Sequence, residues 1–122
     1  MKIYLSHSSN YDYETELYAP LKSSATAREH QILFPHDEEN INTNSKNLIQ
    51  HSDLIIAEVS YPSTGQGIEL GWANNGGVPI LCLYKTGAKL SSSLQFITKE
   101  FIEYANQADM IRKLEDWFTA KE

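Results

Sequence analysis

The sequence predicts an α/β fold: a three-layer sandwich in which helices cover both faces of a five-stranded parallel sheet. Two observations carry this prediction. Short apolar runs alternate with helical apolar spacing, and the runs at residues 54–57 and 80–84 are uninterrupted, as in parallel strands buried on both faces. Such strands need a right-handed crossover helix between them. We expect the flavodoxin-like or Rossmann-like strand order 2-1-3-4-5.

The first third of the chain supplies two strands and two helices. Residues 2–5 form a short apolar strand, and residues 11–21 place apolar side chains on one side of a helix. A second strand is expected at residues 31–34, closed by a proline. Asn44 or Ser45 can cap a short helix that leads the chain into the third strand.

The central region predicts a strand-helix-strand unit. The strand at residues 54–57 ends in the glycine- and serine-rich turn 62–67. A helix follows, because apolar residues recur at helical spacing; these are Ile68, Leu70, Trp72 and Ala73. The Asn-Asn-Gly-Gly run at residues 74–77 ends that helix, and the fourth strand is expected at residues 80–84.

The last part of the chain completes the alternation. Residues 85–89 form a polar turn, and residues 91–96 form either a loop or a short helix. A final strand is expected at residues 101–104, and an amphipathic helix at residues 109–120 closes the fold. At 122 residues, we expect a single domain spanning 1–122.

Composition excludes several classes of partner. The net charge of -6 and the pI near 5.1 argue against a nucleic-acid polymer, although free nucleotides remain compatible. The single cysteine, Cys82, excludes an internal disulfide. No apolar run is long enough for a membrane span, and there is no signal-peptide pattern, so we expect a cytoplasmic protein without a membrane partner. No Cys or His cluster has metal-ligand spacing, and we expect neither a metal nor a cofactor.

The predicted topology brings two loops together. Ligands of parallel sheets bind beyond the carboxyl ends of the strands at the switch point, which lies between residues 6–10 and 60–69. The turn 63–67 offers free N–H groups and a hydroxyl at a helix N-terminus, which favours an anion such as phosphate. Many such turns carry glycine for backbone reasons alone, and Glu69 in the first turn could simply complement the helix dipole.

The motif AEVSYPSTGQGIELGWA, followed by PILCLYKTG, resembles the nucleoside 2-deoxyribosyltransferase superfamily, most closely its 2'-deoxynucleoside 5'-monophosphate N-glycosidase branch. The similarity is strongest at residues 53–84 and extends to residues 2–8. It implies that Glu69 attacks the anomeric carbon, which gives a covalent glycosyl-enzyme, and that Tyr4 positions the nucleophile and the sugar. The implied partner is a small nucleoside or nucleotide.

The resemblance also assigns phosphate contacts and an assembly. Ser63 matches a phosphate-binding serine, and Ser91 or Ser93 matches a second one that reaches a neighbouring subunit's site. The resemblance therefore implies a homodimer or a higher homo-oligomer. The remaining candidate substrate or phosphate contacts are Ser8, Gly65 and Gly67.

The chain departs from this family at two places. The family's second catalytic carboxylate falls near Ser45, which cannot replace it, and residues 6–10 lack the family's glycine-containing loop. The missing acid could come from the loop after the second strand, which could equally be a solvated acidic loop; its carboxylates are Asp37, Glu38 and Glu39. His7 or His36 could protonate a departing base, although such histidines are more often hydrogen-bonded loop residues.

Three functional hypotheses follow. The first is an N-glycosidase or deoxyribosyltransferase with Glu69 as the nucleophile. The second is a non-catalytic nucleotide-binding domain, consistent with the serine at position 45. The third is a TIR-like NAD glycohydrolase or signalling module, since Ser-His-Ser-Ser after the first strand and SDLIIAEVS resemble TIR domains. A receiver domain is disfavoured because paired acids do not follow the first strand.

Overall fold

A computed structural model describes residues 1–40 and 44–121 of the chain. Its centre is a five-stranded sheet in which every neighbouring pair of strands is parallel, in the order β2-β1-β3-β4-β5. The strands are β1 (Lys2–His7), β2 (Gln31–Leu33), β3 (Leu54–Glu58), β4 (Ile80–Lys85) and β5 (Phe101–Tyr104). The predicted strand order and the parallel sheet are confirmed.

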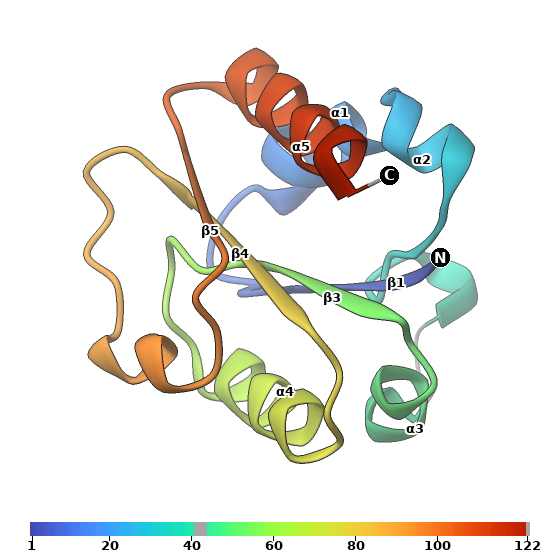
Figure 1. Cartoon of the computed structure of the whole chain (residues 1–122), viewed down its shortest axis with the longest axis vertical. Helices are drawn as coiled ribbons and strands as arrows, with labels where there is room; N and C mark the ends of the chain where they lie inside the picture. Colours follow the sequence, from blue (N-terminus) through green and yellow to red (C-terminus); the bar gives the residue numbers. More distant parts are fainter. Residues whose placement is uncertain (41–43, 122) are drawn as a thin grey trace.

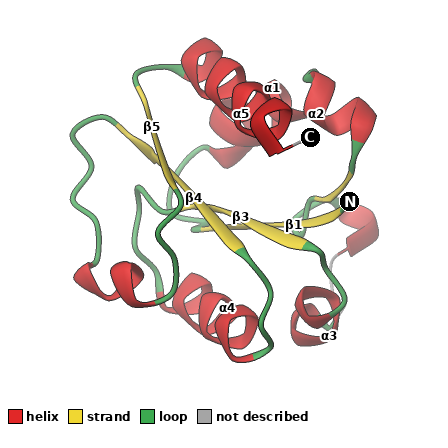
Figure 2. Ribbon diagram, in the orientation of Figure 1, coloured by secondary structure: helices red, strands yellow, loops and turns green. Residues whose placement is uncertain are grey.

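Helical segments cover the sheet on both faces, as predicted (Figure 1). One face carries the π-helical turn η1 (Glu14–Tyr18), α1 (Ala19–Lys22), α2 (Ala25–Glu29) and α5 (Gln107–Lys121). The other carries α3 (Ser45–Gln50), α4 (Thr64–Asn75) and the 3-10 helix η3 (Ser92–Phe96), while η2 (Glu38–Asn40) is a single turn (Figure 2). Alternate β1 residues enter the two cores: Ile3 and Leu5 pack below α1 and α5, and Tyr4 packs toward α3 and α4.

The N-terminal half differs from the prediction at four points. Strand β1 extends through His7, because two polar residues at its end are buried rather than exposed; these are Ser6 and His7. Strand β2 ends at Leu33, one residue early, and the helix expected at residues 11–21 is divided into η1 and α1. Helix α2 was not predicted; the Ser24 side chain caps it by accepting a hydrogen bond from the Ala27 amide at 3.3 Å.

Helix α4 begins earlier than the sequence predicts. Its first residue is Thr64, and the Ser63 hydroxyl caps it by accepting a hydrogen bond from the Gln66 amide at 3.4 Å. Gly65 and Gly67 therefore lie in the first turn of the helix rather than in a loop before it. Ile68, expected on the buried side, is 49% exposed, so its assignment to the apolar face was wrong.

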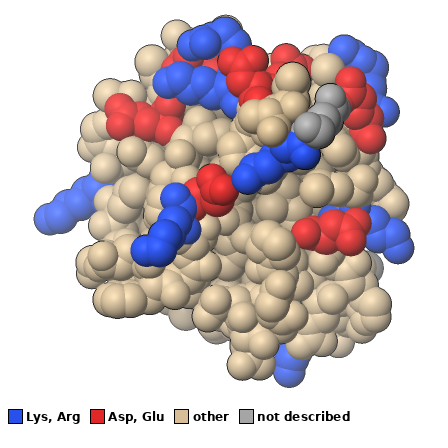
Figure 3. Space-filling view, in the orientation of Figure 1, with Lys and Arg blue, Asp and Glu red and all other residues tan. Residues whose placement is uncertain are grey.

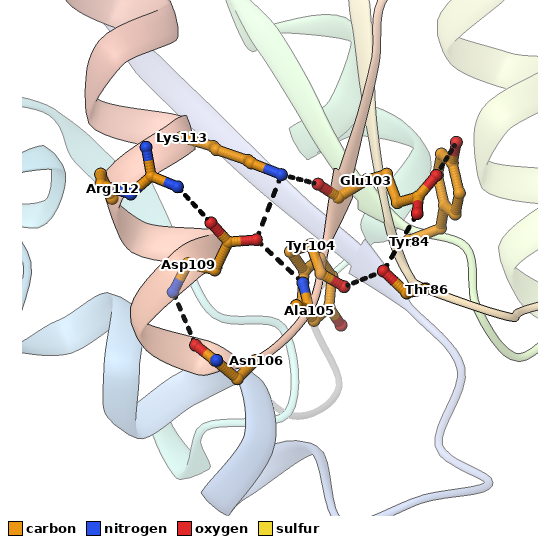
Figure 4. A network of polar contacts seen from close by, with 9 residues as sticks. All are labelled: Tyr84, Thr86, Glu103, Tyr104, Ala105, Asn106, Asp109, Arg112 and Lys113. Atoms are coloured by element: carbon orange, nitrogen blue, oxygen red, sulfur yellow. Dashed lines mark hydrogen bonds and ion pairs between the residues drawn. The ribbon is translucent and has the colours of Figure 1, made fainter.

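Charged side chains hold the corner between β5 and α5. The Asp109 carboxylate accepts a hydrogen bond from the Ala105 amide at 2.9 Å and pairs with Lys113 at 3.1 Å (Figure 4). Glu103 accepts hydrogen bonds from Tyr84 and Thr86 beside it. Across residues 1–40 and 44–121, no helix is both long and apolar enough to cross a membrane.

Candidate active site

Glu69 meets two hydroxyl groups of strand β1 at the carboxyl edge of the sheet. The Tyr4 hydroxyl donates a hydrogen bond of 2.6 Å to Oε2, and the Ser6 hydroxyl donates one of 2.9 Å to Oε1. Tyr4 and Ser6 share a face of β1 because side chains alternate along a strand. Helix α4 packs on that face and brings Glu69 over them. Among residues 1–40 and 44–121, each carboxylate oxygen thus has one hydrogen-bond donor.

The surroundings of Glu69 act on its charge in opposite directions. Burial raises the pKa of the Glu69 carboxyl, while the bonds from Tyr4 and Ser6 and the nearby charge of His36 oppose that rise. Burial, together with the Glu69 charge, keeps the pKa of Tyr4 well above its usual range, so its hydroxyl remains a donor. Glu69 itself is half-buried. A carboxylate held in this way can act as a nucleophile or a base.

The structure places Ser45 beside this pair. Its hydroxyl lies near enough to the Tyr4 side chain to lower the pKa of Tyr4. The position where the resemblance expects a second carboxylate therefore faces Tyr4 and carries a neutral hydroxyl. In the acidic loop that was a candidate source of this carboxylate, Asp37 pairs with Lys22 at 2.8 Å, and Glu38 and Glu39 are exposed on η2.

The two candidate histidines differ sharply. His7 is buried, and its Nδ1 lies 2.8 Å from the Ser8 carbonyl, so that nitrogen carries the proton. Its Nε2 then accepts the Tyr18 hydroxyl at 2.7 Å, and burial lowers the pKa of His7 to about 4. His7 is thus neutral at pH 7. His36 is exposed, lies 4.9 Å from His7 between ring centroids, and is near enough to Glu69 to act on its charge.

A cavity of about 250 Å³ lies on the other side of the first turns of α4. Four of the predicted contact residues line it: Ser63, Gly67, Ser91 and Ser93. Its apolar wall comes from β3, α4 and η3, through Val59, Leu70, Leu94 and Ile97. The lining contains neither Glu69 nor Tyr4, so the predicted site residues form two groups on either side of α4.

Two predicted contact residues, Ser8 and Gly65, belong to neither of these groups. Ser8 is buried, and its hydroxyl accepts a hydrogen bond from the Asn10 amide at 3.0 Å. Gly65 is exposed in the first turn of α4. A Cβ added to Gly65 or Gly67 would meet no atom within 4 Å, so packing inside the chain does not require glycine at either position.

Sequence reasoning missed two residues of the site. Ser6 could have been found, because it follows Tyr4 by two positions in a strand and therefore shares its face. Gln66 could not, since its partners are main-chain carbonyls, which leave no side-chain pattern in the sequence: its side-chain amide donates to Glu58 at 2.7 Å and to Ser6 at 3.2 Å. In the described part of the chain, no group of three or more His, Cys, Asp or Glu side chains could hold a metal ion.

Known proteins similar to this chain share one kind of chemistry in their names. A 5-hydroxymethyl-dUMP N-hydrolase from Branchiostoma floridae is 36% identical over 85 residues, which cover 59% of this chain and 81% of that protein. A 2'-deoxynucleoside 5'-phosphate N-hydrolase 1 from Trichoplax adhaerens, named as putative, is 31% identical over 90 residues, or 70% of this chain and 62% of that protein. The chain spans less than two thirds of the length of this and other curated relatives. No family model matches.

Solved structures agree on the fold. A CMP N-glycosidase from Clostridium botulinum superposes with a TM-score of 0.70 at 20% identity, over 94% of this chain and 99% of that one. A deoxyribosyltransferase from Leishmania mexicana gives a TM-score of 0.51 at 25% identity, over 68% of this chain and 63% of that one. With the Branchiostoma relative, these similarities show that the chain belongs to the nucleoside 2-deoxyribosyltransferase superfamily, in the branch of the 2'-deoxynucleoside 5'-phosphate N-hydrolases.

Proposed function

We propose that this protein cleaves the N-glycosidic bond of a small nucleoside or nucleoside 5'-monophosphate, by hydrolysis or by deoxyribosyl transfer. One observation carries the proposal: a half-buried carboxylate, Glu69, is held by Tyr4 and Ser6 at the carboxyl edge of a parallel sheet. Ligands of such sheets bind at this edge. The names of its relatives, N-hydrolases and an N-glycosidase, supply the reaction class.

The proposed reaction is a double displacement. A Glu69 oxygen forms a bond to the anomeric carbon as the bond to the base nitrogen breaks, and the electron pair leaves with the base, which takes up a proton. Water, or a second base, then attacks the anomeric carbon and the bond to Glu69 breaks; the proton that the attacking group loses replaces the one given to the departing base. Tyr4 fixes the carboxylate while the charge on it changes. His36, exposed and near Glu69, is the proposed source of the proton, because His7 is already neutral and has both ring nitrogens engaged.

The first turn of α4 is the proposed phosphate site. Helix α4 runs from Thr64 to Asn75, so its N-terminus offers the main-chain N–H groups of Thr64 and Gly65, which have no acceptor within the helix, and the positive end of the dipole. Ser63 adds a hydroxyl. The open space beside Gly65 and Gly67 supports the proposal, because glycine there leaves room for a ligand to approach the main chain.

We also propose a homodimer in a reducing, cytoplasmic setting. Ile68 on α4 is 49% exposed and Phe96 on η3 is 81% exposed, and these two elements border the apolar cavity. Figure 3 shows fewer charged side chains over α4 than over α5. A second subunit would cover this surface and bring Ser91 or Ser93 to the first subunit's site. Burial raises the pKa of the Cys82 thiol to about 12, so it stays an unreactive thiol.

Ser45 favours a second candidate, a domain that binds nucleotides without turnover. It places a neutral hydroxyl where the resemblance expects a catalytic carboxylate. Both candidates predict that nucleotides raise the melting temperature through ligand linkage. Only the first predicts that a base is released.

The deciding experiment incubates the wild-type chain with ribo- and deoxynucleosides, their 5'-monophosphates and NAD, and measures released base by chromatography. We expect release from at least one nucleoside or monophosphate, and none from Glu69→Gln, whose circular dichroism spectrum should match the wild type. Stabilisation by a nucleotide without release would favour the binding domain. Release of nicotinamide alone would instead indicate an NAD glycohydrolase. Absence of both release and stabilisation would contradict both candidates.

A further inference from the structure

Gln66 occupies an unusual place for a polar side chain. It lies in the first turn of α4, is only 5% exposed, and uses its side-chain amide nitrogen twice. One hydrogen bond, of 2.7 Å, goes to the Glu58 carbonyl at the end of β3. The other, of 3.2 Å, goes to the Ser6 carbonyl near the end of β1. A buried amide is costly unless its hydrogens are paired, so these two bonds fix where the side chain can lie.

Gln66 and Glu69 act on the same strand residue. Positions three apart on a helix are neighbours, so both side chains leave α4 toward the end of β1. Gln66 binds the Ser6 main chain, and Glu69 binds the Ser6 hydroxyl at 2.9 Å. Ser6 is thereby held at two atoms by one helix. Any shift of the first turn of α4 against β1 would change both contacts together.

We propose that Gln66 is a positioning residue: its amide clamps the first turn of α4 to the ends of β1 and β3 and so aligns the Glu69 carboxylate with Tyr4 and Ser6. The clamp is specific to the site end of the helix, because both carbonyl partners lie at the carboxyl edge of the sheet. For its kinetic consequence, the inference rests on the proposed function. Its geometric consequence, the environment of the Glu69 carboxyl, can be measured without any substrate.

The test uses two substitutions and a matched control. Gln66→Leu keeps most of the volume and removes both donors. Gln66→Glu keeps the shape but turns a carboxylate toward two carbonyls, which only its protonated form can bind. Ser24→Ala is the control: Ser24 is also buried and its hydroxyl also donates to a main-chain carbonyl, that of Leu21 at 2.6 Å, but it lies on the opposite face of the sheet.

Two readouts separate positioning from simple stability. We expect Gln66→Leu to lower kcat about 10- to 100-fold, the loss typical of a misplaced reacting group, with the larger effect on kcat than on KM. In an NMR titration of ¹³C-labelled glutamate, assigned with Glu69→Gln, the pKa of Glu69 should rise further because its two donors move away. Ser24→Ala should lower the melting temperature and leave both readouts as in the wild type. For Gln66→Glu, kcat relative to the wild type should recover as the pH falls.

Wild-type kcat and a wild-type Glu69 pKa in Gln66→Leu would overturn the inference and leave Gln66 a purely structural residue. If Gln66→Leu does not fold, the same readouts on Gln66→Glu decide: a loss that does not recover at acid pH contradicts the clamp. If the wild type releases no base from any nucleotide, the proposed function fails. The titration of Glu69 still decides the role of Gln66 in that case.

Discussion

Glu58 and Glu69 are two carboxylates at the same edge of the sheet, one on each face. Glu58 ends β3 and is 1% exposed; it accepts hydrogen bonds from the Ser60 amide at 2.6 Å, from the Ser60 hydroxyl at 3.0 Å, and from the Tyr104 hydroxyl. Glu69 is half-buried and accepts one bond at each oxygen. Burial raises the pKa of both groups.

The difference lies in what remains available to a ligand. The chain itself supplies three donors to Glu58 and covers it, so this carboxylate joins β3 to β5 through Tyr104. Glu69 keeps acceptor capacity and access from outside. A raised pKa is therefore a poor guide to a reactive group in this fold, and the count of protein donors together with exposure is a better one.

The largest expected effect comes from replacing each of the two carboxylates with an amide. Glu69→Gln should lower base release by about 1000-fold or more, because a nucleophile is lost. It should change stability little, because both partners of Glu69 are hydroxyl groups, which can rotate to accept a hydrogen bond from the new amide. Glu58→Gln should cost about 1 to 3 kcal/mol of unfolding free energy, since its amide group would face existing donors. Urea unfolding and base release measure the two properties separately.

Loss of base release in Glu58→Gln molecules that remain folded would contradict the purely structural role of Glu58. Glu58 would then belong to the site, despite its saturation by Ser60 and Tyr104. A loss of stability in Glu69→Gln as large as that in Glu58→Gln would instead show that Glu69 also holds the fold together.

Tyr4→Phe tests whether the Tyr4 hydroxyl aligns the Glu69 carboxylate. It removes the donor to Oε2, so we expect kcat to fall about 10- to 100-fold through loss of alignment. The Tyr4 bond lowers the pKa of Glu69, and its loss should therefore move the acid limb of the pH–rate profile to higher pH. A profile whose acid limb does not move would mean that Glu69 is not the group that titrates there.

The fold was largely readable from the sequence because two strands contain continuous apolar runs between turn residues, at residues 54–57 and 80–84, and helical spacing alternates with the strands. The burial of polar side chains at the end of β1 was not predicted. Ser6 and His7 extend β1 because α4 and Tyr18 supply partners for them, and local sequence does not show those partners. The position of Glu69 followed from its motif, whereas its link to Gln66 depends on carbonyls as many as 60 residues away.

Tyr104→Phe tests the structural half of the comparison with a smaller effect. It removes one of three donors to Glu58 and keeps the ring in the core, so we expect a loss of about 1 to 2 kcal/mol in unfolding free energy and unchanged kcat. Tyr84→Phe is a suitable control, because its hydroxyl bonds the exposed Glu103 and should contribute much less. Equal losses in the two variants would contradict the structural role given to Glu58.

The smallest effect is on the pH dependence of stability, to which His7 and the two carboxylates contribute with opposite signs. The pKa of His7 falls from 6.5 to about 4 on folding, so the unfolded chain binds the extra proton between these values and stability falls as the pH drops through that window. The raised pKa values of Glu58 and Glu69 give the opposite sign: their contribution is present below the unfolded value of about 4.3 and is lost as the pH rises through their folded values.

In His7→Gln, the loss of stability between pH 8 and pH 6 should therefore be about 0.8 kcal/mol smaller than in the wild type. Urea midpoints at the two pH values measure this difference, and identical pH dependence in both proteins would show that His7 is not held neutral by its burial.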